Sequence, residues 1–398
     1  MSRKTRKTLI FTGKLAVAVL LLLWVLGQVH WRDYVQAKAD GRTYAVLEAL
    51  PNRGEPAELR VGRGLFGSQE PQLRPVGDFE PLPAGRRVIR PGFASSFRQI
   101  EVPLAVLGAA GFGAALVLIA VRWRMLLGIQ DIRISLWETI RLTFLGQFFN
   151  AIVPGTVGGD LVKAYYVSKH TPKKAAVLVS IFFDRLLGLV ELAVMAAGML
   201  LAVVWGNLVE DLADVRLPAV CVAAVLVAVA GMLSFLLSTR FRKALRLEKL
   251  YQRLPIAHHI AAAGDAASLY RRRPGALVYA VLISFAAHLA FVGFVYMTGK
   301  SLAIRMAWYN YFVYVPLIYI IGSVPLTPGG VGWVENWYVR FFESPQCGAS
   351  TILVLALLAR LIPVLWGLPG AVVAVTGARL PKADSIQAEL GMGRETAE

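Results

Sequence analysis

The sequence has few charged residues and little that would hold a metal or a nucleotide. Only 17% of its 398 residues are charged, whereas a soluble domain has about 25%. Its two cysteines and five histidines show no zinc-ligand spacing, and it has no Gly-x-x-x-x-Gly-Lys-Ser/Thr loop for ATP. We therefore expect no metal, no cofactor and no direct use of ATP, and the composition argues against a soluble domain.

Acidic residues are also scarce, with 25 Asp and Glu against 42 Lys and Arg. The resulting charge of +17 is compatible with nucleic-acid binding or with the orientation of a membrane protein. The basic residues gather beside apolar runs, as the positive-inside rule requires. We therefore predict membrane orientation and no nucleic-acid partner.

Hydrophobic residues make up 57% of the chain, and the mean hydropathy is +0.58. Their runs are continuous rather than alternating, and several approach the roughly 20 residues that a helix needs to cross a bilayer. This predicts an all-α polytopic membrane protein with about six full spans. The predicted spans are Leu9–Val29, Val102–Val121, Ala175–Val204, Pro218–Ser238, Ala276–Thr298 and Ser350–Thr376.

The first span is preceded by four basic residues and can be interpreted as a cleaved signal peptide or a retained anchor. The nearest small-x-small site, Ala37-Lys38-Ala39, lies far from the apolar run. We therefore favour a signal-anchor helix over residues 1–29 with a cytoplasmic N-terminus.

Residues 30–101 form a polar, Pro- and Gly-rich stretch that we interpret as a small extracytoplasmic insert, with Arg42–Leu47 and Leu59–Val61 as candidate strands. The basic loop 239–274 and the tail 378–398 should be cytoplasmic, because positive residues stay inside. These elements bound a first membrane half, 102–238, and a second, 275–377. The charge pattern predicts a multi-pass protein of the plasma membrane with both termini inside.

Two apolar segments are interrupted by glycine-rich turns. Segment 137–170 breaks at a Pro154-Gly155 pair, and segment 308–342 breaks at Pro328-Gly329. Each arm is short for a span; Thr139–Val153 would cover only about 22 Å as a helix. We predict two re-entrant hairpins that enter from opposite sides of the membrane.

The two breaks have similar sequences, P-G-x-V-G-G-D and P-G-x-V-G-W-V-E, and each lies between two predicted spans. By span count, the two sets have opposite orientations. This is the inverted-topology repeat of many transporters, whose sites lie where broken helices meet. The alternative is coincidence, since Pro-Gly pairs are common in turns.

Ionisable side chains within spans are costly and are usually functional or paired. Asp184, Gly188 and Glu191 share one helical face, and Arg185 and Arg360 lie in predicted spans. The arginines are either phosphate ligands or structural partners of Asp184 or Glu191. His288 is more typical of a packed residue than of a proton relay.

Beside the breaks, Asp160 and Glu335 either bind ligand or cap their own helices. Asn150 either adds hydrogen bonds to a site or satisfies carbonyls freed at Pro154.

Four pieces resemble the lysylphosphatidylglycerol synthase transmembrane region family, a group of flippase-like membrane domains. They are N-A-I-V-P-G-T-V-G-G-D-L-V-K (150–163), F-D-R-L-L-G (183–188), P-L-T-P-G-G-V-G-W-V-E (325–335) and A-R-L-I-P…L-P-G (359–370). The resemblance, over roughly residues 102–377, implies a domain that moves a lipid with a charged or modified headgroup between leaflets. Thr156 and Trp333-Val334 depart from the pattern, and the insert has no counterpart in it.

The ionisable residues within the spans favour a headgroup cavity without catalytic residues, and the resemblance implies that Asp160, Asp184, Arg185, Glu335 and Arg360 are functional. The predicted lining of the cavity is Asn150, Gly155, Gly158, Gly159, Asp160, Lys163, Asp184, Arg185, Gly329, Gly330, Gly332, Glu335 and Arg360. The expected ligand is a membrane lipid, either an anionic or a headgroup-modified phospholipid.

No aminoacyltransferase domain follows the last span, so we expect a transporter more than an enzyme. One alternative is a membrane-embedded transferase that uses Asp160, Asp184 or Glu335 as general base. Another is a non-catalytic membrane protein that binds a soluble or membrane partner through loop 239–274.

Overall fold

The computed structural model describes residues 3–39, 41–52, 55–63, 69–82, 88–152, 158–169, 171–208, 212–237, 270, 273–324, 326–344 and 346–376. The chain divides into two compact units that we describe separately. The first comprises Met1–Ala109, Phe294–Tyr314 and Val324–Leu361; the second comprises Ala110–Gly293, Val315–Ser323 and Ile362–Glu398. Most of loop 239–274 and the whole of tail 378–398 lie outside the described residues.

The protein is mostly helical. Among the described residues, four helices are long and apolar enough to cross a bilayer: α3 (Val102–Ile129), α6 (Lys174–Trp205), α11 (Pro274–Ser301) and α14 (Ala349–Thr376). They coincide with four of the six predicted spans. The other two predicted spans fall in α1 (Arg3–Gly27) and α7 (Leu212–Leu237), whose apolar stretches are the shorter Ala16–Gly27 and Val215–Gly231.

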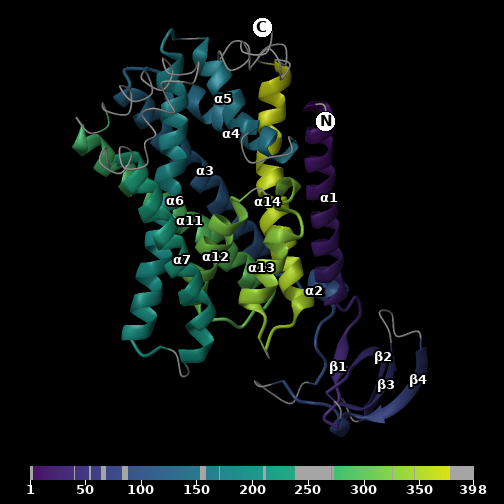
Figure 1. The fold of residues 1–398 in the computed structure, drawn as a ribbon. Helices are drawn as coiled ribbons and strands as arrows, with labels where there is room; N and C mark the ends of the chain where they lie inside the picture. The colour runs from purple at the N-terminus through teal and green to yellow at the C-terminus, as the bar shows by residue number, and fades with distance from the viewer. Residues whose placement is uncertain are drawn as a thin grey trace. The chain divides into compact units, whose positions relative to one another are not determined.

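The polar insert contains a four-stranded antiparallel sheet with the strands in chain order (Figure 1). The strands are β1 (Tyr34–Gln36), β2 (Thr43–Asn52), β3 (Glu55–Arg63) and β4 (Gln69–Pro75). Strand β2 contains the first predicted strand segment except Arg42, and β3 contains the whole of the second. The alternating residues of these strands bury one face, where Val35, Tyr44, Leu59 and Val61 pack with Phe79.

Within the first unit, the insert contacts α14 and helix α1 contacts the broken second segment. The insert ends in the short helix α2 (Phe93–Arg98), where Ser96 Oγ lies 2.8 Å from Thr351 Oγ1 of α14. The backbone N–H of His30 donates to Ser350 Oγ at 2.9 Å. Helix α1 packs against α13 (Trp333–Phe342). These contacts join the insert to α14 and the first helix to α13, which carries Glu335.

The first broken segment, in the second unit, forms helices α4 (Leu136–Ile152) and α5 (Gly158–Ser168), which pack side by side (Figure 1). The second forms α12 (Trp308–Gly322), the 3₁₀ turn Pro328–Gly330 and α13. Both segments are therefore helix–break–helix elements, as the Pro-Gly pairs indicate.

The second predicted span ends at Val121, but α3 continues to Ile129. Arg122 therefore lies within the helix, and it is only 4% exposed. An arginine can lie inside an apolar helix when a carboxylate neutralises it. Asp184 of α6 provides that carboxylate.

Candidate functional site

At the first break, an ion pair joins the hairpin to the long helix α6. Asp160 lies in the first turn of α5, is 8% exposed, and accepts a hydrogen bond at Oδ2 from Arg185 Nε. Asn150 Oδ1, at the end of α4, accepts the N–H of Gly159 at 2.9 Å. Asn150 therefore satisfies a free amide at the start of the next helix. Gly155 lies outside the described residues.

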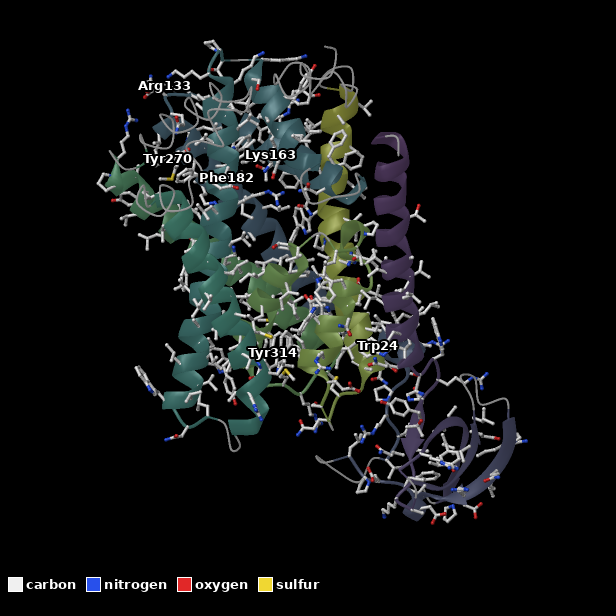
Figure 2. The ribbon with its side chains drawn as sticks, in the orientation of Figure 1. Trp24, Arg133, Lys163, Phe182, Tyr270 and Tyr314 are labelled. Carbon is white, nitrogen blue, oxygen red and sulfur yellow. The ribbon has the colours of Figure 1, made fainter. Side chains whose placement is uncertain are left out.

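Small residues let the two arms of this hairpin touch. A Cβ added to Gly159 would lie 2.0 Å from the Gly146 carbonyl oxygen, so only glycine fits. Beside this contact, Lys163 is 8% exposed and its Nζ lies 5.0 Å from the Trp123 ring centroid (Figure 2). A cation over an aromatic face is stabilised by the ring quadrupole. The break thus carries two cations, Lys163 and Arg185, within the second unit.

Three glycines shape the second break. Gly329, Gly330 and Gly332 have φ values of 61°, 70° and 76°, in the left-handed region that glycine adopts without strain. The N–H of Gly332 donates to Glu335 Oε2 at 2.8 Å. Glu335 is 3% exposed and caps the start of its own helix. The capping alternative for this residue is therefore realised.

Arg360 of α14 binds residues of the same break. Its Nε donates to Glu335 Oε1 at 2.7 Å, and its two terminal nitrogens donate to the Gly329 and Gly330 carbonyls at 2.7 and 3.2 Å. All three guanidinium nitrogens are therefore used. In this structure Arg360 neutralises Glu335 and satisfies carbonyls that the left-handed turn leaves without helical partners.

The two carboxylate–arginine pairs occupy corresponding positions in the sequence. In each pair the arginine follows the carboxylate by 25 residues. A shift of 175 residues carries Asp160 onto Glu335 and Arg185 onto Arg360. Both carboxylates are buried at 11% and 4% side-chain exposure, whereas the arginines are 41% and 30% exposed. The similarity of the two breaks therefore extends to which side chains bind each other.

Asp184 has a different partner from the one that we considered. It accepts a hydrogen bond from Arg122 Nε at 2.7 Å, and Arg122 also donates to Ser284 of α11. Arg185, the next residue of α6, pairs with Asp160 instead. Both arginines are thus structural partners of carboxylates, with Arg185 bound to Asp160 and Arg360 bound to Glu335. The signal for Arg122 was present, because Arg122 and Asp184 are both charged residues within long apolar runs.

The remaining buried carboxylate of α6 meets a histidine. Glu191 Oε2 lies 3.3 Å from His288 Nδ1 of α11, and their side chains are 8% and 14% exposed. Among the described residues, neither Glu191 oxygen nor His288 Nδ1 makes a hydrogen bond. Within the same residues, no group of three or more His, Cys, Asp or Glu side chains is arranged to hold a metal ion.

The predicted site residues thus form two groups, one in each unit. Asn150, Gly158, Gly159, Asp160, Lys163, Asp184 and Arg185 belong to the second unit, whereas Gly329, Gly330, Gly332, Glu335 and Arg360 belong to the first. The inverted repeat predicts that the two breaks meet, and this stays a prediction. Each group contains one glycine-rich break, one buried carboxylate at the start of a helix and one arginine from a long apolar helix.

Comparison with known sequences identifies a family for most of the chain. The model of the Lysylphosphatidylglycerol synthase TM region family matches residues 92–370. A comparison with curated proteins and one with solved structures find no match. The matched range contains both breaks, both carboxylate–arginine pairs, α3, α6, α11 and most of α14, and it begins after the sheet of the insert.

Proposed function

The chain belongs to the Lysylphosphatidylglycerol synthase TM region family, and we propose that it is a multi-pass membrane protein that moves an anionic or headgroup-modified phospholipid between leaflets. The observation that carries this proposal is the Asp160–Arg185 pair. It places a 41%-exposed arginine against a buried carboxylate at the start of a broken helix. We also propose that the protein lies in the plasma membrane with both termini in the cytoplasm.

Arg185 would bind the headgroup phosphate. A guanidinium recognises phosphate and carboxylate through the same pair of parallel hydrogen bonds, so a phosphate can replace Asp160 as its partner. Lys163 lies on the same hairpin and adds a second positive charge. The N-terminus of α5 contributes a partial positive charge of its own. These three features favour an anionic group at the first break.

Arg360 would have a different role. It already donates to Glu335 and to two backbone carbonyls, and releasing it would leave these groups without partners. We therefore assign Arg360 to holding the second break in shape, with Glu335. The corresponding sequence positions of the two pairs support an inverted repeat, in which both segments are re-entrant and line one pathway.

The test is lipid movement in proteoliposomes that contain headgroup-labelled phosphatidylglycerol. Arg185→Gln should slow movement about 10- to 100-fold, because a hydrogen bond to a charged group contributes about 1.5–3 kcal/mol. Arg185→Lys should restore part of the rate, since lysine keeps the charge but not the parallel geometry. The matched control is Arg133→Gln, which changes an exposed arginine between α3 and α4 (Figure 2).

Thermal unfolding of each variant in detergent separates loss of function from loss of fold. A folded Arg185→Gln protein that moves lipid at the wild-type rate would remove the basis of the headgroup site. Equal slowing by Arg133→Gln would indicate a general effect of surface charge instead.

A further inference from the structure

Helices α3, α6 and α11 enclose a run of polar side chains that the headgroup site does not use. Arg122 lies on α3, Asp184 and Glu191 lie on α6, and His288 lies on α11. Arg122 binds Asp184 at 2.7 Å, and His288 Nδ1 lies 3.3 Å from Glu191 Oε2. All four residues belong to the second unit. The run occupies the apolar part of three helices long enough to cross a bilayer.

Gly188 connects the two pairs. A Cβ added there would lie 3.8 Å from Arg122 Nη1 and 3.8 Å from His288 Nε2 and Cε1. The histidine ring therefore lies between Glu191, which its Nδ1 faces, and the Gly188–Arg122 side. Because Asp184, Gly188 and Glu191 follow each other on one face of α6, the polar groups form one continuous line.

The charge of this line is balanced only when it holds one more proton. Arg122 and Asp184 neutralise each other, so an ionised Glu191 beside a neutral His288 leaves one uncompensated negative charge. An isolated charge within a bilayer is costly. One proton held between Glu191 and His288 neutralises the run and gives the two groups the hydrogen bond that neither makes within the described residues.

Two neighbouring polar groups among the described residues, Ser284 and Tyr319, do not supply that charge. On α11, Ser284 is neutral and accepts from Arg122. From α12, Tyr319 lies edge-on to Phe291, which is three residues after His288 on α11. The charged groups of the run are therefore Arg122, Asp184, Glu191 and, when protonated, His288.

We propose that Glu191 and His288 bind the proton whose movement drives lipid transport. The inference rests on the proposed function and adds its energy source. Helix α6 carries both Glu191 and Arg185, so a change at Glu191 can be transmitted through one helix to the headgroup site. In the transport cycle, Glu191 or His288 takes a proton from water on one side and releases it to water on the other, with no other bond made or broken.

The first test is lipid movement under a pH gradient in proteoliposomes, with the membrane potential clamped at zero by valinomycin and potassium. One proton per lipid predicts a steady-state asymmetry of labelled phosphatidylglycerol of about ten-fold per pH unit. Glu191→Gln and His288→Asn should lose this asymmetry and still exchange lipid without a gradient. Glu101→Gln, at an exposed carboxylate before α3, is the matched control and should behave as wild type.

Two results of this assay would overturn the inference. One is a full pH-driven asymmetry in Glu191→Gln. The other is an asymmetry that a sodium gradient produces at equal pH on both sides.

The second test does not depend on lipid transport. Infrared difference spectra of the purified protein, recorded across a pH titration, should contain a protonated-carboxyl band that Glu191→Gln removes and Glu101→Gln keeps. Glu191→Asp retains a carboxyl group and should retain a protonated-carboxyl band. This variant tests the proton site if Glu191→Gln does not fold. If wild type moves no lipid, the proposed function fails, while the band still tests the proton site. A band unchanged in Glu191→Gln would refute the proton site alone.

Discussion

The buried Arg122–Asp184 pair should be among the most sensitive positions for stability. Replacing Arg122 with methionine keeps much of the side-chain volume but leaves Asp184 without its partner. The two side chains are 5% and 11% exposed, and Arg122 Nε lies 2.7 Å from Asp184 Oδ1. Water therefore cannot solvate the Asp184 carboxylate once its partner is removed. Removing one member of a buried pair costs about 3–5 kcal/mol, and the Ser284 hydroxyl loses its donor as well.

The exposed Arg60–Glu48 pair of the sheet provides the comparison. Arg60 Nη1 lies 3.9 Å from Glu48 Oε2, and the two side chains are 53% and 56% exposed. Arg60→Met should therefore lower the free energy of unfolding by only about 0–1 kcal/mol. The double variant Arg122→Met with Asp184→Leu should recover to within about 1 kcal/mol of wild type, because packed apolar residues often replace a buried ion pair without loss.

The assay is the free energy of unfolding in detergent micelles, from denaturant titration followed by tryptophan fluorescence. Two results would refute the reasoning. The first is a loss in Arg122→Met no larger than that in Arg60→Met. The second is a double variant as unstable as the single one, which would mean that Arg122 acts through packing rather than through Asp184.

Three further predictions concern packing, reactivity and orientation. Gly159→Ala should lower the free energy of unfolding by about 1–3 kcal/mol, because its Cβ would meet the Gly146 carbonyl oxygen at 2.0 Å. Burial raises the pKa of the Cys347 thiol to about 12, so maleimide at pH 8 should label Cys347 only after denaturation. A membrane-impermeant thiol reagent added outside cells should label Gln69→Cys and not Gln252→Cys.

Each of these predictions has its own control. Gly128→Ala, in α3, meets nothing within 4 Å and should not lower stability, so a similar loss there would contradict the packing argument. Cys347→Ser identifies the labelled thiol by mass, and fast labelling of the folded protein would contradict its burial. Labelling of Gln252→Cys from outside the cell would place loop 239–274 outside. It would contradict the orientation that we infer from the charge pattern.

Much of the architecture follows from local sequence. Continuous apolar runs predict α3, α6, α11 and α14, because a helix in lipid must satisfy its own backbone and bury about 20 residues. The Pro-Gly pairs predict that α4 and α5, and likewise α12 and α13, are separate helices. The motifs around Asp160, Arg185, Glu335 and Arg360 identify the family.

The tertiary structure decided which charges meet. Sequence spacing indicates that Asp184, Gly188 and Glu191 share a face of α6, but the partner of each depends on how neighbouring helices are rotated and how deep each residue lies. Composition cannot reveal this, so His288 was more typical of a packed residue and the Arg122–Asp184 pair was not predicted. The insert shows the same division, because the sequence indicated two of its strands, while strand order and register arose from pairing across the sheet.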